Sequence, residues 1–238
     1  MRRKNTPFKF KQFIVHHDRC SMKVGTDAVL LGAWVNIENT KTILEVGTGS
    51  GVISLILAQR TLPYAKIEAI EIEKEDAEQA QENIVRSPWP EKIKIHHQSL
   101  QSFIANKTFD LIVSNPPYFI NSHLPPSGKR SQARHTGSLN YTELIKYAVK
   151  LLSPIGRLAV VLPFEEGKQF QTLARASDLH VVRQLAFYSR QGKPQERWLF
   201  EFSFLHTEIV NENLILHATG EDWSVDYKKL TRDFYLDL

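Results

Sequence analysis

The sequence contains only one cysteine in 238 residues, so no disulfide can form within the chain. A chain without disulfides is typical of a reducing compartment, and we expect a cytoplasmic protein. Its apolar runs are shorter than the ~20 residues that a membrane-spanning helix needs. The basic start Met1-Arg2-Arg3-Lys4-Asn5 is not followed by the apolar segment of a secretory signal. These absences argue against a disulfide-rich secreted protein and against a membrane protein.

One segment of the sequence groups several potential metal ligands. The segment His16-His17-Asp18-Arg19-Cys20 contains two histidines, an aspartate and the single cysteine. Zinc sites usually take paired ligands from two places in a sequence, and no second cysteine exists here. We therefore expect no bound metal.

No linker rich in glycine or serine, internal repeat or low-complexity segment divides the chain. With 42% apolar residues the chain can bury a complete core, most simply as one domain, and we expect a monomer. The expected parts are a cover segment over residues 1–40, a core over 41–205 and a C-terminal extension over 206–238. The net charge of +4 at pH 7 suits a polyanionic partner but is common among other enzymes.

Segments that predict strands alternate with segments that predict helices. The expected strands cover residues 42–46, 66–71, 92–96, 109–114, 156–162, 180–188 and 197–205. The expected helices cover residues 28–35, 51–60, 74–86, 141–152 and 166–177. This alternation favours an α/β fold with a mainly parallel sheet covered on both faces. The short connection Gln191-Gly192-Lys193-Pro194 predicts a hairpin between the last two strands.

A glycine-rich turn follows the first expected core strand. Gly47, Gly49 and Gly51 lie between that strand and a predicted helix. Glycines at such a turn let the backbone approach a ligand closely and leave free N–H groups at the start of the helix. A dinucleotide-binding Gly-x-Gly-x-x-Gly pattern would need a glycine where this sequence has Val52. The turn therefore predicts a ligand-binding site, although its glycines do not follow the dinucleotide-binding pattern.

Two acidic residues accompany the turn. Glu45 lies just before the glycines, and Glu71 ends the strand expected at residues 66–71. Ligands of α/β sheets bind beyond the carboxyl ends of the strands, where a carboxylate can bind ribose hydroxyl groups. We therefore expect both acids to belong to a cofactor site.

The motif Asn115-Pro116-Pro117-Tyr118 follows the apolar strand expected at residues 109–114. Two successive prolines remove two N–H donors and fix φ twice, so neither a helix nor a central strand can continue. The corner presents an amide side chain, carbonyls without sheet partners and an aromatic ring. An amino group on a planar ring needs acceptors for its hydrogens and a surface for stacking. An ordinary turn is the other interpretation of the same residues.

These motifs resemble those of class I S-adenosylmethionine-dependent amino-methyltransferases. More narrowly, the segments FIVHHDRCSMKVGTD at 13–27, ARHT at 133–136 and LTRDFYL at 230–236 resemble bacterial tRNA methyltransferases that modify N6 of adenine 37 in a valine tRNA. The resemblance implies a Rossmann-like sheet of seven strands, of which the last is antiparallel. It also implies S-adenosylmethionine as the cofactor and the anticodon loop of a tRNA as the substrate.

The expected cofactor site combines residues predicted from the turn with others that the resemblance implies. In many relatives an acid after the third strand contacts the cofactor's adenine, whereas this sequence offers Gln98 or Ser99 as an acceptor. The resemblance places Lys23, Thr26 and Asp27 at the wall of the pocket. The expected cofactor-binding residues are Lys23, Thr26, Asp27, Glu45, Gly47, Gly49, Gly51, Glu71, Ile72, Gln98, Ser99 and Asn115.

The reaction that the resemblance implies is direct methyl transfer to an exocyclic nitrogen. If the Asn115 side-chain oxygen and the Pro116 carbonyl accept the two hydrogens of the amino group, the nitrogen can direct its lone pair at the methyl carbon. Tyr118 would stack on the base, a contact worth about 1–3 kcal/mol. We expect Asn115, Pro116, Pro117 and Tyr118 to form the catalytic corner, without a general base.

The connection at residues 122–139 is long enough to predict a functional or a disordered loop. It contains Lys129, Arg130, Arg134 and His135, which we expect to bind phosphates beside a flipped nucleotide. A solvated loop is the alternative interpretation.

Other functions fit the same motifs. The corner also suits methylation of DNA adenine, of a guanine amine in ribosomal RNA or of a release-factor glutamine, because each nitrogen is conjugated with a planar group. A DNA enzyme would usually add a recognition domain, and a release-factor enzyme a helical domain before the core. A nicotinamide-dependent dehydrogenase is disfavoured by Val52. A non-catalytic RNA-binding module is disfavoured by the intact glycine turn and corner.

Overall fold

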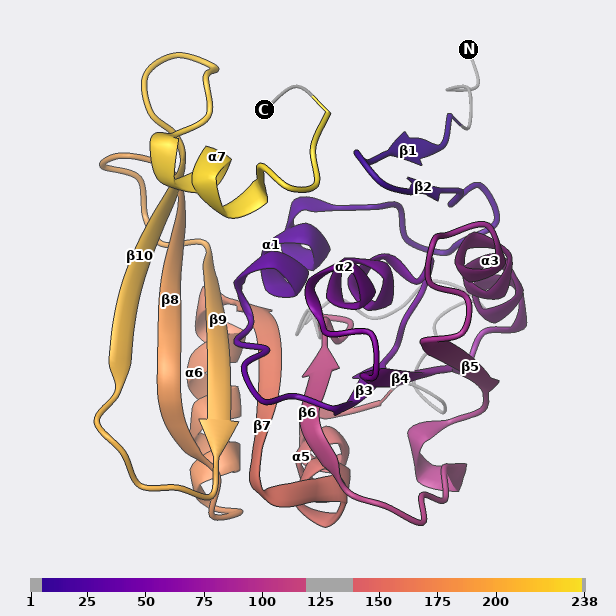
Figure 1. Ribbon diagram of the computed structural model, residues 1–238. Helices are drawn as coiled ribbons and strands as arrows, with labels where there is room; N and C mark the ends of the chain where they lie inside the picture. Colours follow the sequence, from indigo (N-terminus) through magenta and orange to yellow (C-terminus); the bar gives the residue numbers. More distant parts are fainter. Residues whose placement is uncertain (1–5, 119–138, 237–238) are drawn as a thin grey trace, which may run out of the picture.

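The computed structural model describes residues 6–118 and 139–236, which form an α/β structure around one large sheet (Figure 1). The strand order in this sheet is β10-β8-β9-β7-β6-β3-β4-β5. Strand β9 runs antiparallel to both of its neighbours, and all other pairs are parallel. The strands are β3 (Thr42–Val46), β4 (Lys66–Glu71), β5 (Ile93–His97), β6 (Phe109–Ser114), β7 (Leu152–Pro163), β8 (His180–Arg190), β9 (Arg197–Ser203) and β10 (Val210–His217).

The seven strands expected from the sequence are present, and the hairpin between β8 and β9 is confirmed. The expected count of seven is one too low, because β10 adds an eighth strand beside β8. Strand β10 is an edge strand in which only Leu214 is buried. An edge strand with polar residues in its first half lacks the apolar alternation that predicts strands.

Helices cover both faces of the sheet, and a separate hydrophobic cluster lies on each face. Helices α1 (Thr26–Trp34), α2 (Val52–Arg60), α3 (Lys74–Val85) and α7 (Val225–Thr231) contribute to one cluster. Helices α5 (Tyr141–Leu151) and α6 (Phe164–Arg175) and the short 3-10 helix η1 (Leu100–Ser102) contribute to the other. The five helices expected from the sequence are confirmed within a few residues. None of the helices in the described ranges is long and apolar enough to cross a membrane.

The first and last described segments of the chain pack together over α1 and α2. A small hairpin of β1 (Phe8–Lys9) and β2 (Ile14–Val15) lies near the C-terminal segment, and Phe10 bridges Tyr235. Tyr227 and Phe234 are buried in the same cluster. These C-terminal aromatic residues are therefore part of the hydrophobic core.

The segment after β2 is bound to α3 by buried polar side chains. The Asn83 side chain pairs with both backbone groups of His16, at 2.7 and 2.9 Å, and also donates to the carbonyl of Ser50 at 2.9 Å. Asp76 accepts hydrogen bonds from the amide and hydroxyl of Ser21 at 3.0 and 2.7 Å. These bonds connect the N-terminal segment to the glycine turn through one helix.

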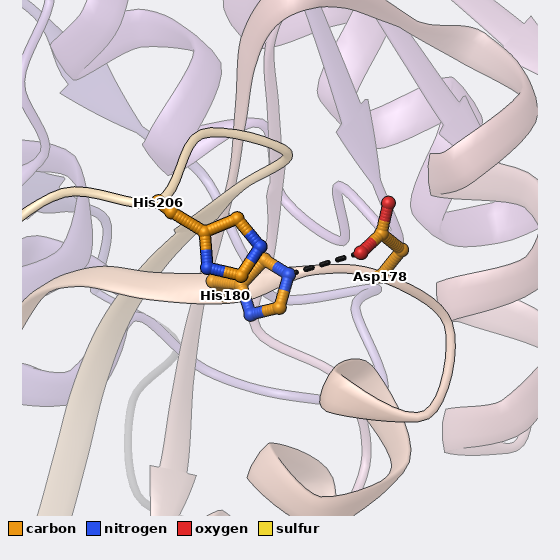
Figure 2. A group of neighbouring side chains, drawn as sticks. All are labelled: Asp178, His180 and His206. Carbon is orange, nitrogen blue, oxygen red and sulfur yellow. Dashed lines mark hydrogen bonds and ion pairs between the residues drawn. The ribbon is translucent and has the colours of Figure 1, made fainter.

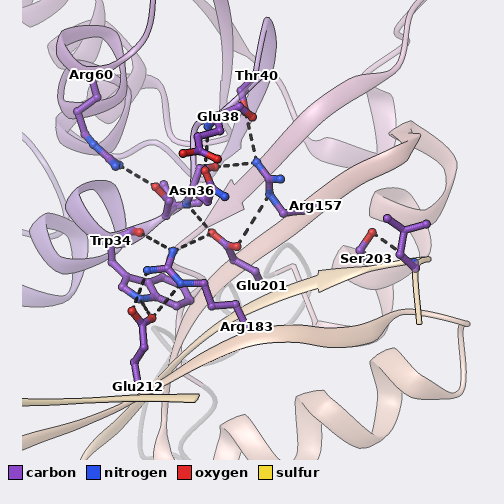
Figure 3. A network of polar contacts seen from close by, with 12 residues as sticks. Trp34, Asn36, Glu38, Thr40, Arg60, Arg157, Arg183, Glu201, Ser203 and Glu212 are labelled. Carbon is purple, nitrogen blue, oxygen red and sulfur yellow. Dashed lines mark hydrogen bonds and ion pairs between the residues drawn. The ribbon is translucent and has the colours of Figure 1, made fainter. Parts of the chain in front are cut away.

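A polar network connects the end of α1 to the strands of the antiparallel half (Figure 3). Glu201 on β9 is 2% exposed and accepts the Asn36 amide at 2.5 Å. Arg183 on β8 lies 3.7 Å from Glu201 and pairs with Glu212 on β10 at 2.9 Å. Arg157 on β7 lies 3.9 Å from Glu201. This network fixes four neighbouring strands against the helix layer.

The carboxyl ends of β3, β4, β5 and β6 meet at one edge of the sheet because these strands are parallel and adjacent. Strand β9 begins at the same edge, where Arg197 lies opposite Pro163 at the end of β7. In α/β sheets this edge is where ligands bind.

Candidate functional site

The glycine turn between β3 and α2 has the backbone conformation that glycine permits. The φ angles of Gly47, Gly49 and Gly51 are 75°, 54° and 82°, in the left-handed region that other residues rarely adopt. A Cβ atom placed on Gly47 or Gly49 would meet no other atom within 4 Å. The turn therefore borders open space, and it leaves room for a ligand against its backbone.

Glu45 lies beneath this turn and is 1% exposed. Its Oε2 atom accepts hydrogen bonds from the Thr48 hydroxyl at 2.7 Å, from the Ser54 amide at 3.0 Å and from the Ser54 hydroxyl. Its Oε1 atom is buried without a partner among the described residues. Burial raises the pKa of Glu45 to about 7, although the bonds from Ser54 and Thr48 oppose this shift. The sequence predicted Glu45 but not the hydroxyl groups that support it.

This pKa predicts a pH dependence of stability. Glu45 has an ordinary pKa of 4.5 and a folded pKa of about 7, so the folded state binds its proton more tightly than the unfolded state does. The contribution is fully present below pH 4.5 and is lost as the pH rises through 7. We expect the free energy of unfolding to fall by about 3 kcal/mol over this interval through Glu45 alone.

Urea unfolding of the wild type and of Glu45→Gln at pH 5 and pH 8 would measure this contribution, because the amide does not titrate. The stability of the wild type should fall relative to Glu45→Gln as the pH rises. An identical pH dependence in both proteins would contradict the raised pKa.

Glu71 at the end of β4 links the turn to the next strand. Its carboxylate accepts the Gly49 amide at 2.8 Å and the Glu73 amide at 2.9 Å. Burial raises its pKa, while these two amide bonds oppose the shift. Ile72 beside it is about half exposed. The backbone N–H of Gln98 donates to the backbone carbonyl of Glu71 at 3.0 Å. Glu71 thus connects the end of β4 to the glycine turn through its side chain and to the end of β5 through its backbone.

The proline corner begins next to the glycine turn. The Ser114 hydroxyl, at the end of β6, donates to the Val46 carbonyl at the end of β3 at 2.8 Å. Asn115 follows directly and is partly buried, and Pro116 is buried. The Tyr118 hydroxyl donates to Asp27 at 2.5 Å and lies 3.2 Å from the Asn115 side-chain oxygen. The burial of Tyr118 and the charge of Asp27 raise the pKa of the phenol, so it remains a donor.

Arg197 is a member of this corner that the sequence did not predict. Its Nε atom donates to Asp27 at 3.0 Å, and its guanidinium lies 5.4 Å from the centre of the Tyr118 ring. The side chain of Asp27, expected at the wall of a cofactor pocket, therefore contacts the tyrosine and the arginine. No local pattern around Arg197 marks this role, because the contact depends on where β9 enters the sheet.

Several predicted residues have other contacts in the structure. Lys23 donates from its Nζ atom to the His17 carbonyl at 2.8 Å, and Thr26 is exposed at the start of α1. Ser99 caps η1 by accepting the Ser102 amide at 3.3 Å. These contacts occupy Lys23 and Ser99 within the protein. The basic residues Lys129, Arg130, Arg134 and His135 and the corner's continuation beyond Tyr118 lie outside the described residues.

Two side chains of the His16–Cys20 segment are held within the protein. The thiol of Cys20 is buried, and burial raises its pKa to about 12, so it remains protonated. The Nδ1 atom of His17 accepts the Val24 amide at 3.1 Å. Both observations agree with the structural role of this segment.

The chain is similar to known proteins along almost its whole length. A family model described as methyltransferase small domain matches residues 20–182. A protein of Bacteroides thetaiotaomicron named tRNA1(Val) (adenine(37)-N6)-methyltransferase is 43% identical over 234 residues, which cover 98% of this chain and 99% of that protein. A Yersinia pestis protein of the same name is 44% identical over 232 residues, with 97% and 94% covered.

Solved structures show the fold. A structure described as a predicted O-methyltransferase from Agrobacterium tumefaciens aligns with a TM-score of 0.68 at 17% identity, covering 90% of this chain and 100% of that one. A class I S-adenosylmethionine-dependent methyltransferase from Listeria monocytogenes aligns with a TM-score of 0.55 at 13% identity, covering 79% and 62%. The fold is thus that of class I methyltransferases. With the near-complete coverage and high identity of the sequence relatives, the chain belongs to the methyltransferase small domain family and, within it, to the tRNA1(Val) (adenine(37)-N6)-methyltransferases.

Proposed function

We propose that this protein transfers a methyl group from S-adenosylmethionine to N6 of adenine 37 in the anticodon loop of a valine tRNA. The observation that carries the proposal is the position of Asn115 beside the glycine turn, where the Ser114–Val46 hydrogen bond joins the two strand ends. The full-length relatives with this name support the choice of substrate. The proposed enzyme acts as a monomer in the cytoplasm.

The chemistry of the turn fits the cofactor. Glu45 has a buried carboxylate oxygen that no described residue contacts by a hydrogen bond, and the ammonium group of S-adenosylmethionine is a donor of the kind it lacks. The open space beside Gly47 and Gly49 leaves room for the methionine part. In this proposal Glu71, at the end of the next strand, binds the ribose hydroxyl groups. When bound there, S-adenosylmethionine supplies a methyl group that its sulfonium already activates.

The corner residues would hold the adenine amino group. The Asn115 side-chain oxygen and the Pro116 carbonyl accept its two hydrogens, which leaves the nitrogen lone pair free to face the methyl group. The Tyr118 hydroxyl lies 3.2 Å from the Asn115 oxygen in the structure, so the substrate amino group takes the place of this contact. The Tyr118 ring then stacks on the base. Lys129, Arg130, Arg134 and His135 bind the flanking phosphates in this proposal.

Replacing Glu71 by alanine is expected to weaken S-adenosylmethionine binding by about 10- to 100-fold, because hydrogen bonds to a charged group contribute about 1.5–3 kcal/mol. Isothermal titration with the cofactor product, S-adenosylhomocysteine, would measure the change. Glu73→Ala is the matched control, since Glu73 is exposed and contributes only its backbone amide. Equal affinity of Glu71→Ala and the wild type would exclude Glu71 from the site.

The substrate is tested by methyl transfer from labelled S-adenosylmethionine to total tRNA from cells that lack the gene. Nucleoside analysis should give labelled N6-methyladenosine, which maps to the base beside one valine anticodon. No labelling of tRNA by a protein that still binds the cofactor would overturn the proposal. Ribosomal RNA, DNA and release factors would then be tested as substrates.

A further inference from the structure

A second group of polar side chains lies far from the proline corner. Asp178 follows α6, His180 begins β8 and His206 follows β9 (Figure 2). Strand β8 starts where β9 ends, since His180 lies opposite Ser203. Arg197, at the other end of β9, belongs to the corner. This group therefore lies at the opposite ends of the strands from the corner. We infer that Asp178, His180 and His206 form a binding site for a divalent transition-metal ion of the Zn²⁺ type.

The geometry of the three side chains suits one ion. One ligand atom from each residue can be chosen so that all lie within 4.8 Å of one another. The Nε2 atom of His180 lies 3.0 Å from an Asp178 carboxylate oxygen, and the two imidazole rings have centres 3.7 Å apart. Ligands that bind one zinc ion at about 2.0–2.2 Å lie roughly 3–4 Å from each other. Small side-chain rotations are therefore enough to surround an ion.

The donor set indicates the class of metal. Imidazole nitrogens suit Zn²⁺, Ni²⁺, Cu²⁺ and Fe²⁺, whereas Mg²⁺ and Ca²⁺ prefer sets made of oxygen ligands. Two histidines and one carboxylate leave at least one position for water. Asp178 and His206 are exposed and His180 is partly exposed, so an ion can reach the group from solvent.

The backbone around the group also brings the ligands together. Asp178 has a φ of 61°, a left-handed conformation that is uncommon for residues other than glycine. Asp178 lies in the turn before β8, His180 begins β8, and His206 lies in the connection between β9 and β10. His180 and His206 line a shallow surface depression with Arg175 and Ile209. An ion here would connect the start of β8 to the segment that leads into β10.

The site was not expected from the sequence. His206 is separated from Asp178 and His180 by the whole β8–β9 hairpin, and no cysteine accompanies them. The expectation of no bound metal rested on the His16–Cys20 segment, which is structural. The inference is independent of the proposed methyl transfer, because the two sites lie at opposite edges.

The test uses the full-length, tag-free protein after treatment with a chelator, with Zn²⁺ as the probe in isothermal titration. We expect one ion per chain. Removal of one ligand should weaken binding by about tenfold or more, since even partners of ligands contribute 10- to 100-fold. His180→Ala and His206→Ala are the test variants, and His217→Ala on β10 is the matched control. Circular dichroism would verify that each variant is folded, and His206→Asn offers a second variant of similar polarity.

Two further readouts separate the site from weak surface binding. Zn²⁺ at a concentration that just saturates the wild type should raise the unfolding temperature of the wild type and of His217→Ala clearly more than that of His206→Ala. Co²⁺ should give visible absorption bands in the wild type that are lost in His180→Ala. Equal binding in wild type and His206→Ala would overturn the inference, as would binding that is lost in Cys20→Ser or a complete lack of binding.

Discussion

Replacing Asn115 by alanine is expected to lower the rate constant of the methyl-transfer step on tRNA by about 10²–10³-fold. Removing one preorganised hydrogen-bonding group that acts on a reacting atom typically has an effect of this size. Asn115 has this position because it follows β6 directly, and the Ser114–Val46 hydrogen bond holds the strand end against the glycine turn. A single-turnover assay with saturating cofactor and tRNA would measure the chemical step.

The controls for Asn115 separate catalysis from binding. Cofactor and tRNA affinities of Asn115→Ala should stay within a few fold of the wild type. Asn115→Asp retains an acceptor oxygen and should lose less activity than Asn115→Ala, while Asn211→Ala, on the exposed edge strand, should lose none. Full activity of Asn115→Ala would contradict the proposed role. Loss of tRNA binding together with activity would instead indicate a binding role.

Replacing Glu201 by alanine is expected to lower the free energy of unfolding by about 3–5 kcal/mol, as is typical when one member of a buried ion-pair network is removed. Glu201 is almost completely buried and accepts the Asn36 amide, while Arg183 and Arg157 approach it from the neighbouring strands (Figure 3). Its removal leaves the Asn36 amide without this acceptor. Burial raises the pKa of Glu201, and the Asn36 bond and the two arginines oppose the shift.

Thermal and urea unfolding would measure the effect, which corresponds to a fall in unfolding temperature of about 10 °C for a chain of this size. Glu201→Gln keeps an oxygen for the Asn36 amide and should lose much less stability, about 1 kcal/mol. The exposed Glu208→Ala should change stability by less than about 0.5 kcal/mol. A loss below about 1 kcal/mol in Glu201→Ala would show that the network contributes little.

The parts of the structure that local patterns encode could be predicted. The glycine turn, the acid at the end of β4 and the proline corner follow from residues close together in sequence, and parallel strands then bring them to one edge. Strand β10 was missed because it is an exposed edge with little apolar alternation. Arg197 was missed because its contact with Asp27 depends on the antiparallel insertion of β9. The group around His206 was missed for the same reason.

The order of synthesis decides when the contact of Arg197 with Asp27 and Tyr118 can form. The glycine turn and the proline corner leave the ribosome first, but Arg197 follows only with β9, which inserts between β7 and β8. A nascent chain that ends before residue 197 therefore has an open edge on β7 and lacks the Arg197 guanidinium beside Asp27. The corner is completed late in translation, so an incomplete chain carries the recognisable motifs without the arrangement that they form in the finished protein.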